Sequence, residues 1–150
     1  MKNIHWLGAG LSSIPGIRRL ASNNLNLTVW NRTLSKAEYS INHVQSPNVL
    51  AKTFIFEDFI SSLQEGDIVV SQLPASMHIQ IAKICLEKKC HFASTSYISP
   101  AIKELDQQVR DKKLIFINEI GLDPGIDHFF FSSFSSRTSK AKFKKILSFL

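Results

Sequence analysis

The chain has 150 residues, of which 44% are hydrophobic and 20% are charged, and this composition is typical of one globular domain. No apolar run approaches the roughly 20 residues of a membrane-spanning helix, which argues against a membrane protein. The formal net charge of +6 comes mostly from a basic stretch after Asp127, formed by Arg137, Lys140, Lys142, Lys144 and Lys145. This stretch is not combined with aromatic stacking platforms on a recognised binding fold, so we expect no nucleic-acid partner.

Short apolar runs alternate with helix-like segments along the chain. Strands are expected at 3–8, 26–31, 67–73, 90–96 and 114–120, with a weaker one near 49–54. Helices are expected at 12–22, 35–43, 57–63, 76–88 and 99–112. This alternation predicts an α/β fold with a doubly wound parallel sheet, that is, a Rossmann-type domain over residues 1–140.

The first expected strand runs directly into the sequence GAGLSSIPG. Gly8 permits a tight turn, and Gly10 lets the backbone approach a pyrophosphate at the start of the next helix. Ser13 stands where the G-x-G-x-x-G pattern has its third glycine. The motif therefore favours a dinucleotide site, and the alternative is an ordinary strand-to-helix turn.

The end of the second expected strand distinguishes between cofactors. An acidic residue at this point binds the ribose 2′-hydroxyl of NAD, whereas an arginine accommodates the 2′-phosphate of NADP. The chain has Asn31, Arg32 and Thr33 there, and its next carboxylate is Glu38. This pattern favours NADP, and the alternative is a surface arginine near a helix start.

Polar and turn residues also follow the later strands. The sequences SQLPASMH, STSYISP and NEIGLDPGIDH come after the fourth, fifth and sixth expected strands. Since ligands of such sheets bind outside the carboxyl ends of the strands, Tyr97 and Asp123 are candidates for binding a substrate with an amine. The alternative roles are a helix N-cap for the hydroxyls and a turn cap for Asp123.

The two cysteines, Cys85 and Cys90, form a C-x4-C pair without a second pair. A zinc site needs more ligands, so we expect no metal site and reduced thiols. His5 interrupts the N-terminal apolar run, and we therefore expect no secretory signal and a cytoplasmic location.

The end of the chain is rich in phenylalanine. Residues 141–150 resemble the start of a strand, and six of the eleven phenylalanines follow Asp127, namely Phe129, Phe130, Phe131, Phe134, Phe143 and Phe149. Because such a density of aromatic residues needs a surface on which to be buried, we expect a second domain that is missing from this chain.

Five stretches together resemble the saccharopine reductase family, the NADP-dependent, L-glutamate-forming saccharopine dehydrogenases. They are GAGLSSIP, WNRTLSKAE, VVSQLP followed by His78, STSYISPAIKELD and NEIGLDPGIDH. The resemblance implies reduction by NADPH of the imine between glutamate and aminoadipate semialdehyde, or the reverse reaction, in lysine metabolism. It also implies that the substrate domain is absent here and that any homodimer forms through that domain.

The same resemblance implies a set of site residues. Together with Gly8 from the glycine motif, those expected at the cofactor are Ala9, Gly10, Leu11, Ser12, Asn31, Arg32, Thr33, Leu73, Thr95, Ser96, Leu122, Asp123 and Pro124. Those expected at the amino-acid substrate are Ser96, Tyr97 and Asp123, with Tyr97 and Asp123 as the catalytic pair. Two other interpretations are a related reductase such as carboxynorspermidine dehydrogenase and a dinucleotide-binding module without catalysis.

Overall fold

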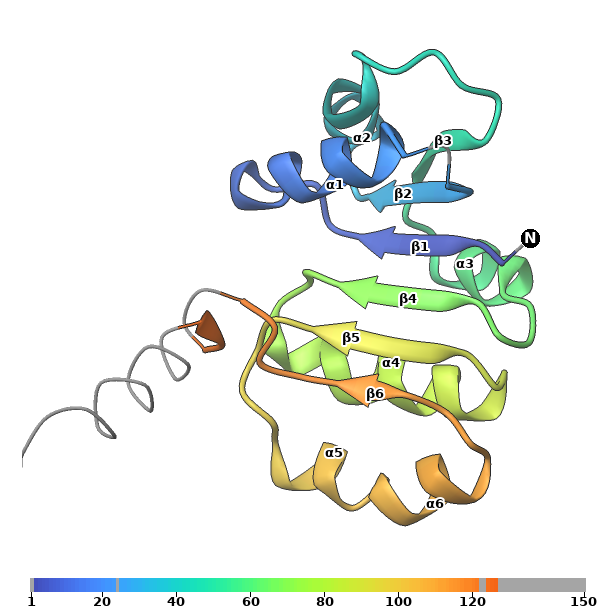
Figure 1. The fold of residues 1–150 in the computed structure, drawn as a ribbon, viewed down its shortest axis with the longest axis vertical. Helices are drawn as coiled ribbons and strands as arrows, with labels where there is room; N and C mark the ends of the chain where they lie inside the picture. Colours follow the sequence, from blue (N-terminus) through green and yellow to red (C-terminus); the bar gives the residue numbers. More distant parts are fainter. Residues whose placement is uncertain (1, 24, 122–123, 127–150) are drawn as a thin grey trace, which may run out of the picture.

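A computed structural model describes residues 2–23, 25–121 and 124–126. It contains a parallel sheet of six strands in the order β3-β2-β1-β4-β5-β6 (Figure 1). The strands are β1 (Ile4–Leu7), β2 (Leu27–Asn31), β3 (Val49–Thr53), β4 (Ile68–Ser71), β5 (His91–Ser94) and β6 (Phe116–Ile117). This is the order of a doubly wound dinucleotide fold, so the predicted fold class is confirmed.

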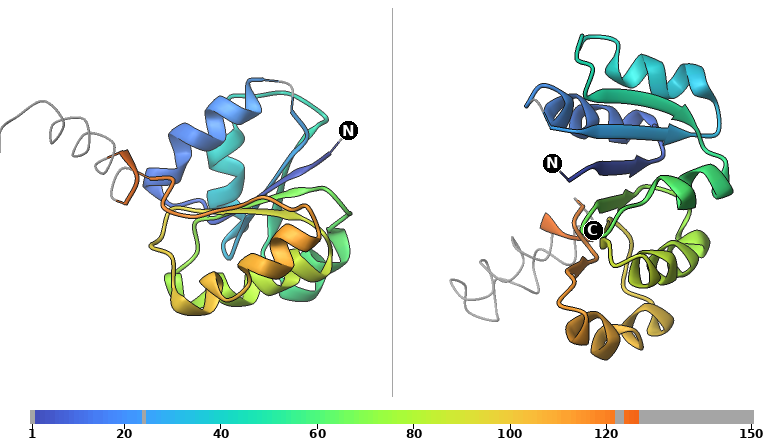
Figure 2. Two further views of the ribbon diagram at one scale, coloured as in Figure 1. Left: turned by 60° about the horizontal axis from the view of Figure 1, so that its bottom comes forward. Right: turned by 90° about the vertical axis from the view of Figure 1, so that its right-hand side faces the viewer.

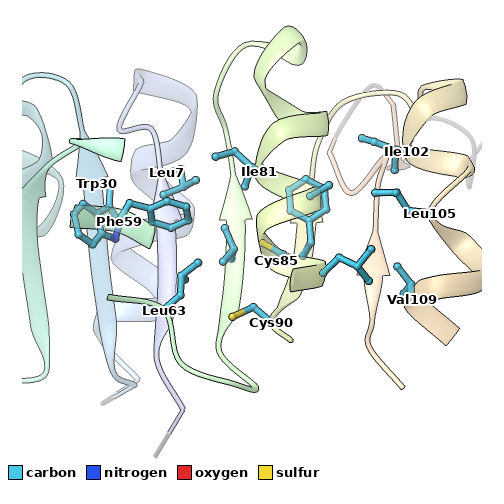
Figure 3. Packing of buried hydrophobic residues seen from close by; sticks show 14 residues of the cluster. Leu7, Trp30, Phe59, Leu63, Ile81, Cys85, Cys90, Ile102, Leu105 and Val109 are labelled. Atoms are coloured by element: carbon cyan, nitrogen blue, oxygen red, sulfur yellow. The ribbon is translucent and has the colours of Figure 1, made fainter. Parts of the chain in front are cut away.

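Helices cover the sheet on two sides (Figure 2). After the short 3-10 helix η1 (Leu11–Ser13), the helices are α1 (Ile14–Ala21), α2 (Leu34–Ile41), α3 (Phe56–Ser62), α4 (Ala75–Glu87), α5 (Pro100–Lys103) and α6 (Asp106–Asp111). Buried side chains of α1 and α2 pack on one face with Leu27 and Val29 of β2. Those of α3 to α6 pack on the opposite face with Leu7, Trp30 and Phe92 (Figure 3).

Successive side chains of a strand point to opposite faces of the sheet, and this explains why the buried residues form two core clusters. In β2, Leu27 and Val29 face α1 and α2, whereas Trp30 belongs to the cluster on the other face. Every residue of β2 except Asn31 is buried, as expected for a parallel strand covered on both faces.

The face of β4, β5 and β6 opposite α4 is less covered. Val70, Ala93 and Ile117 lie in register across it, and Ile117 is 46% exposed. In residues 2–23, 25–121 and 124–126, no helix packs on this face of β4, β5 and β6 (Figure 2).

Two predicted elements differ from the observed ones. The single helix expected over 99–112 is wrong, because a tight turn divides it into α5 and α6. At this turn the Leu105 N–H donates to Ile102 O at 3.1 Å, and both side chains are buried in the larger core cluster. The strand expected over 114–120 is limited to Phe116–Ile117, and Glu119 ends the extended backbone with a φ of 61°.

Candidate functional site

The loop after β1 has a backbone that requires glycine at Gly8. Its φ is +98°, and a Cβ at this position would lie 2.9 Å from the Gln72 carbonyl oxygen. The Gly8 N–H donates to Trp30 O at 2.8 Å, and the Trp6 indole N–H donates to Gly8 O at 3.0 Å. These contacts place the loop at the carboxyl ends of β1 and β4.

Gly10 has a different environment, because a Cβ there would meet no heavy atom within 4 Å. The packing of the described residues therefore gives no reason for a glycine. The residue precedes η1, in which Ser12 is exposed and Leu11 is 88% exposed. Open space beside the start of a helix fits a pyrophosphate bound closely against the backbone.

The close packing of helix on strand depends on Gly16 rather than on position 13. A Cβ on Gly16 would lie 3.0 Å from Cη2 of Trp6, so a larger residue would displace α1 from β1. Ser13 is itself buried. Gly16 is not predicted from the sequence, because its spacing from Gly10 does not match the motif.

The three residues at the end of the second strand, Asn31, Arg32 and Thr33, have different surroundings. The Asn31 side chain is used within the protein, because its Oδ1 accepts from Ala9 N at 3.1 Å and its Nδ2 donates to Thr33 O at 3.0 Å. It thereby ties the end of β2 to the glycine loop. Arg32 and Thr33 are exposed, and the part of the chain that the structure describes offers Arg32 no hydrogen-bond or ion-pair partner.

A cleft of about 510 Å³ lies between the glycine loop and the ends of β4 and β5. Its walls come from η1 and α1, from β1 and β4, and from the loops after β4, β5 and β6. The lining residues are Trp6, Ser12, Ser13, Gly16, Val70, Gln72, Thr95, Ile120 and Gly121. This is the point at which the strand order reverses, where ligands of doubly wound folds bind (Figure 1).

The loops after β4 and β5 are connected across the cleft. The Thr95 hydroxyl donates to Gln72 Oε1 at 3.1 Å, and the Gln72 N–H donates to Leu7 O at 2.8 Å. Leu73, the next residue, is partly buried against the larger core cluster. Thr95 and Leu73 are predicted from the sequence, but Gln72 is not, because its hydrogen bonds join it to Leu7 and Thr95, which are distant in sequence.

The candidate substrate residues lie beside an unusual backbone conformation. Glu119, with its positive φ, donates its N–H to Ser96 O at 3.1 Å and accepts the Ile98 N–H at 3.0 Å on its carboxylate. These two bonds hold the segment with Tyr97, which is 60% exposed. Ser96 and Tyr97 therefore lie next to the loop that follows β6.

A tight turn follows at Gly121. Its N–H donates to Pro124 O at 2.9 Å, and Gly121 forms a bridge with Gly125, whose φ of +147° favours glycine. Pro124 is buried at the base of this turn. The predicted site residues Leu122 and Asp123 lie outside the described residues, as does the strand expected within 141–150.

Two buried polar atoms near the end of β4 have no hydrogen-bond partner among the described residues. They are Ser71 Oγ and His78 Nε2. Burial lowers the pKa of His78, and a hydrogen bond with the Leu73 backbone offsets part of this effect. His78 is thus a neutral side chain under the Leu73 loop rather than a group facing the cleft.

The described residues contain neither a cluster of potential metal ligands nor a helix able to span a membrane. Cys85 and Cys90 are free and buried, and no group of three or more potential metal ligands occurs in the ranges that the structure describes. None of the helices within these ranges has the length and apolar character needed to cross a membrane.

Taken together, the strand order and this edge of the sheet define a dinucleotide-binding domain. The glycine loop leaves open space at Gly10, a cleft follows at the switch point, and an exposed cation lies at the end of β2.

The chain belongs to a known family. Residues 4–117 match the family described as the saccharopine dehydrogenase NADP binding domain, as the sequence resemblance predicted. The match confirms NADP as the predicted cofactor, because the family is defined as an NADP-binding domain.

Named relatives agree with this assignment. Saccharopine dehydrogenase [NADP(+), L-glutamate-forming] of Pyricularia oryzae is 34% identical over 130 residues, which are 86% of this chain and 29% of that protein. The mitochondrial alpha-aminoadipic semialdehyde synthase of Rattus norvegicus is 39% identical over 135 residues, 85% of this chain and 14% of that protein.

A solved structure is similar as well. Apo saccharopine dehydrogenase (L-Glu forming) from Saccharomyces cerevisiae superposes with a TM-score of 0.76 at 31% identity and covers 91% of this chain. The chain corresponds to 31% of that protein, so it spans less than a third of each of these three relatives.

Proposed function

We propose that this chain is the cofactor-binding part of an NADP(H)-dependent oxidoreductase of the saccharopine dehydrogenase type. The reaction joins glutamate and aminoadipate semialdehyde as an imine, which is reduced to saccharopine, or runs in reverse, in lysine metabolism. The observation that carries the proposal is an exposed Arg32 at the end of β2 of a chain in this family, without a hydrogen-bond or ion-pair partner among the described residues. NADPH supplies the hydride when it is bound.

The glycine loop and the end of β2 would bind the two phosphate-bearing parts of the cofactor. Gly8, Ala9 and Gly10 form the turn, and Leu11 and Ser12 follow in η1. Arg32 supplies the charge for the 2′-phosphate, and Thr33 adds a hydroxyl. Asn31 acts differently in this proposal, because its side chain positions the loop through Ala9 and Thr33.

The ends of β4, β5 and β6 would bind the nicotinamide half. Leu73, Thr95, Ser96 and Pro124 belong to loops at this edge, and we assign Leu122 and Asp123, which lie outside the described residues, to the same half of the site. Ser96, Tyr97 and Asp123 would contact the amino-acid substrate, and Asp123 with Tyr97 would orient or ionise its amine. The hydrogen bonds from Glu119 to the segment around Tyr97 support a fixed position for this residue.

Organisation and location form part of the same proposal. Residues 1–140 would be the NADP-binding domain, and 141–150 would lead into a substrate domain through which a homodimer forms. The buried free cysteines suit a reducing, cytoplasmic compartment. Fractionation of cells that express the tagged protein tests this location, and recovery in an organelle would contradict it.

Titration with cofactors tests the proposed function directly. NADPH should quench the tryptophan fluorescence of the chain, because Trp6 lines the cleft, and NADH should bind more weakly. Absence of binding by either cofactor, or tighter binding of NADH, would contradict the proposal.

A further inference from the structure

The ends of β4 and β5 present a hydrogen-bonded pair of side chains to the cleft. Thr95 donates its hydroxyl proton to Gln72 Oε1 at 3.1 Å, and both residues line the cleft. The backbone of Gln72 is fixed as well, since its N–H bonds Leu7 O at 2.8 Å and its carbonyl lies against Gly8. The pair is therefore held in place before any ligand binds.

This hydrogen bond leaves the amide donors of Gln72 and the acceptor lone pairs of Thr95 unused. The Gln72 amide has two N–H donors, and its side-chain hydrogen bond with a described residue uses only the oxygen Oε1. Because the single Thr95 proton is directed to Gln72, the Thr95 oxygen retains its lone pairs as an acceptor. The pair thus offers donors and an acceptor side by side.

This arrangement is complementary to a primary carboxamide. A carboxamide has one carbonyl acceptor and one NH₂ donor group, which matches the amide donors of Gln72 and the oxygen of Thr95. A carboxylate has acceptors only and would leave the Thr95 oxygen facing a negative charge. The strand ends that carry the pair form the half of the edge proposed above for the nicotinamide.

We propose that Gln72 and Thr95 recognise the carboxamide of the nicotinamide ring, with Gln72 donating to its oxygen and Thr95 accepting from its nitrogen. This inference rests on the proposed function. It assigns Gln72 a direct role in cofactor binding and makes the Gln72–Thr95 pair responsible for the orientation of the ring.

Two ligands separate this role from a general effect on the domain. NADPH contains the carboxamide, and 2′-phospho-ADP-ribose has the same phosphates and adenosine without the nicotinamide. With the full chain, Gln72→Leu should weaken NADPH binding roughly three- to tenfold and leave 2′-phospho-ADP-ribose binding unchanged. The matched control is Gln80→Leu, because Gln80 is exposed on α4 and should affect neither ligand.

The outcomes distinguish the two proposals. If the unaltered chain binds neither ligand, the proposed function fails. If it binds both and Gln72→Leu weakens both equally or neither, the role of Gln72 is overturned and the proposed function stands.

A second variant keeps the test decisive if Gln72→Leu does not fold. Thr95→Val retains the branched shape and removes the acceptor. The unaltered chain should bind NADPH more tightly than its 3-acetylpyridine analogue, in which a methyl group replaces the carboxamide NH₂. Thr95→Val should abolish this difference, and an undiminished difference would overturn the proposal.

Discussion

Arg32 is an exposed cation at the end of β2 that makes no hydrogen bond or ion pair with other described residues. We expect Arg32→Ala to reduce NADPH affinity by about tenfold or more, since a hydrogen bond to a charged group contributes roughly 1.5–3 kcal/mol. NADH affinity should not change, because NADH has no 2′-phosphate. Parallel titrations with both cofactors measure this difference.

The exposed Arg19 on α1 provides the control for this prediction. Arg19→Ala removes the same charge away from the end of β2 and should leave the binding of both cofactors unchanged. Equal NADPH affinity of Arg32→Ala and the unaltered chain would show that Arg32 is a surface residue only.

Gly8 and Gly10 should respond differently to the same substitution. Gly8→Ala places a Cβ at a φ of +98° against the Gln72 carbonyl and should reduce the free energy of unfolding by about 1–3 kcal/mol. Gly10→Ala meets open space and should leave stability unchanged while reducing NADPH affinity roughly tenfold. Thermal unfolding and cofactor titration separate the two effects, and normal NADPH binding by Gly10→Ala would contradict a pyrophosphate at this position.

Residues that act through local backbone geometry were predictable from the sequence. Gly8 and Arg32 were identified because a strand-to-helix turn and a strand end are visible in the sequence pattern. Gly16 and Gln72 were not, because their roles depend on contacts with Trp6 and Thr95 that form only in the folded sheet.

Between elements, a buried polar network connects β1, β2 and the loop before β4. His5 is 1% exposed, and its Nδ1 accepts the Trp30 indole N–H at 3.1 Å. Its Nε2 therefore carries the proton and lies 3.3 Å from Asp67 Oδ2. Burial lowers the pKa of His5, and this effect outweighs the opposing influence of Asp67.

This network makes the stability of the domain dependent on pH. Because the folded state holds His5 neutral, its pKa lies below the unfolded value of 6.5. The stabilisation is present above about pH 6.5 and should be lost as the pH falls toward the lowered pKa of the folded state. Urea unfolding from pH 8 to pH 5, compared between the unaltered chain and His5→Gln, measures this contribution.

The exposed His43 gives the control for the pH series. His43→Gln should retain the pH dependence, whereas His5→Gln should reduce it. If the two variants behave alike, His5 is not the group responsible.

Elements with strong periodicity were predicted well, and their ends were not. Apolar spacing predicted a single helix over 99–112, and the core does receive Ile102 from α5, Leu105 from the turn and Val109 from α6. The turn between them preserves this spacing, so periodicity alone does not reveal it. The shortening of β6 depends on the conformation of Glu119, which the β-favouring composition of 114–120 does not indicate.

For the whole molecule, we expect the chain to bind its cofactor without catalysing the reaction. The chain corresponds to 31% of the solved yeast relative, and imine reduction also requires the substrate carboxylates to be held in a reactive geometry. We therefore expect the 150-residue chain to bind NADPH without oxidising it when glutamate and aminoadipate semialdehyde are added. Absorbance of NADPH over time measures this, and steady consumption that depends on both substrates would contradict the proposed division of roles.

The two core clusters have consequences for how the chain folds during synthesis. Every buried member of the smaller cluster lies between Ala9 and Val49, whereas the larger cluster needs residues from Leu7 to Val109. Since a nascent chain emerges from its N-terminus, the face under α1 and α2 can close while β4 is still being made. Leu7 and Trp30 lie on the opposite face of the sheet, and their side chains stay uncovered until α3 and α4 have been synthesised. Because β1 pairs with β4 in the middle of the sheet, β1 is the strand of the N-terminal half that is covered last. Until then its apolar side chains are open to aggregation.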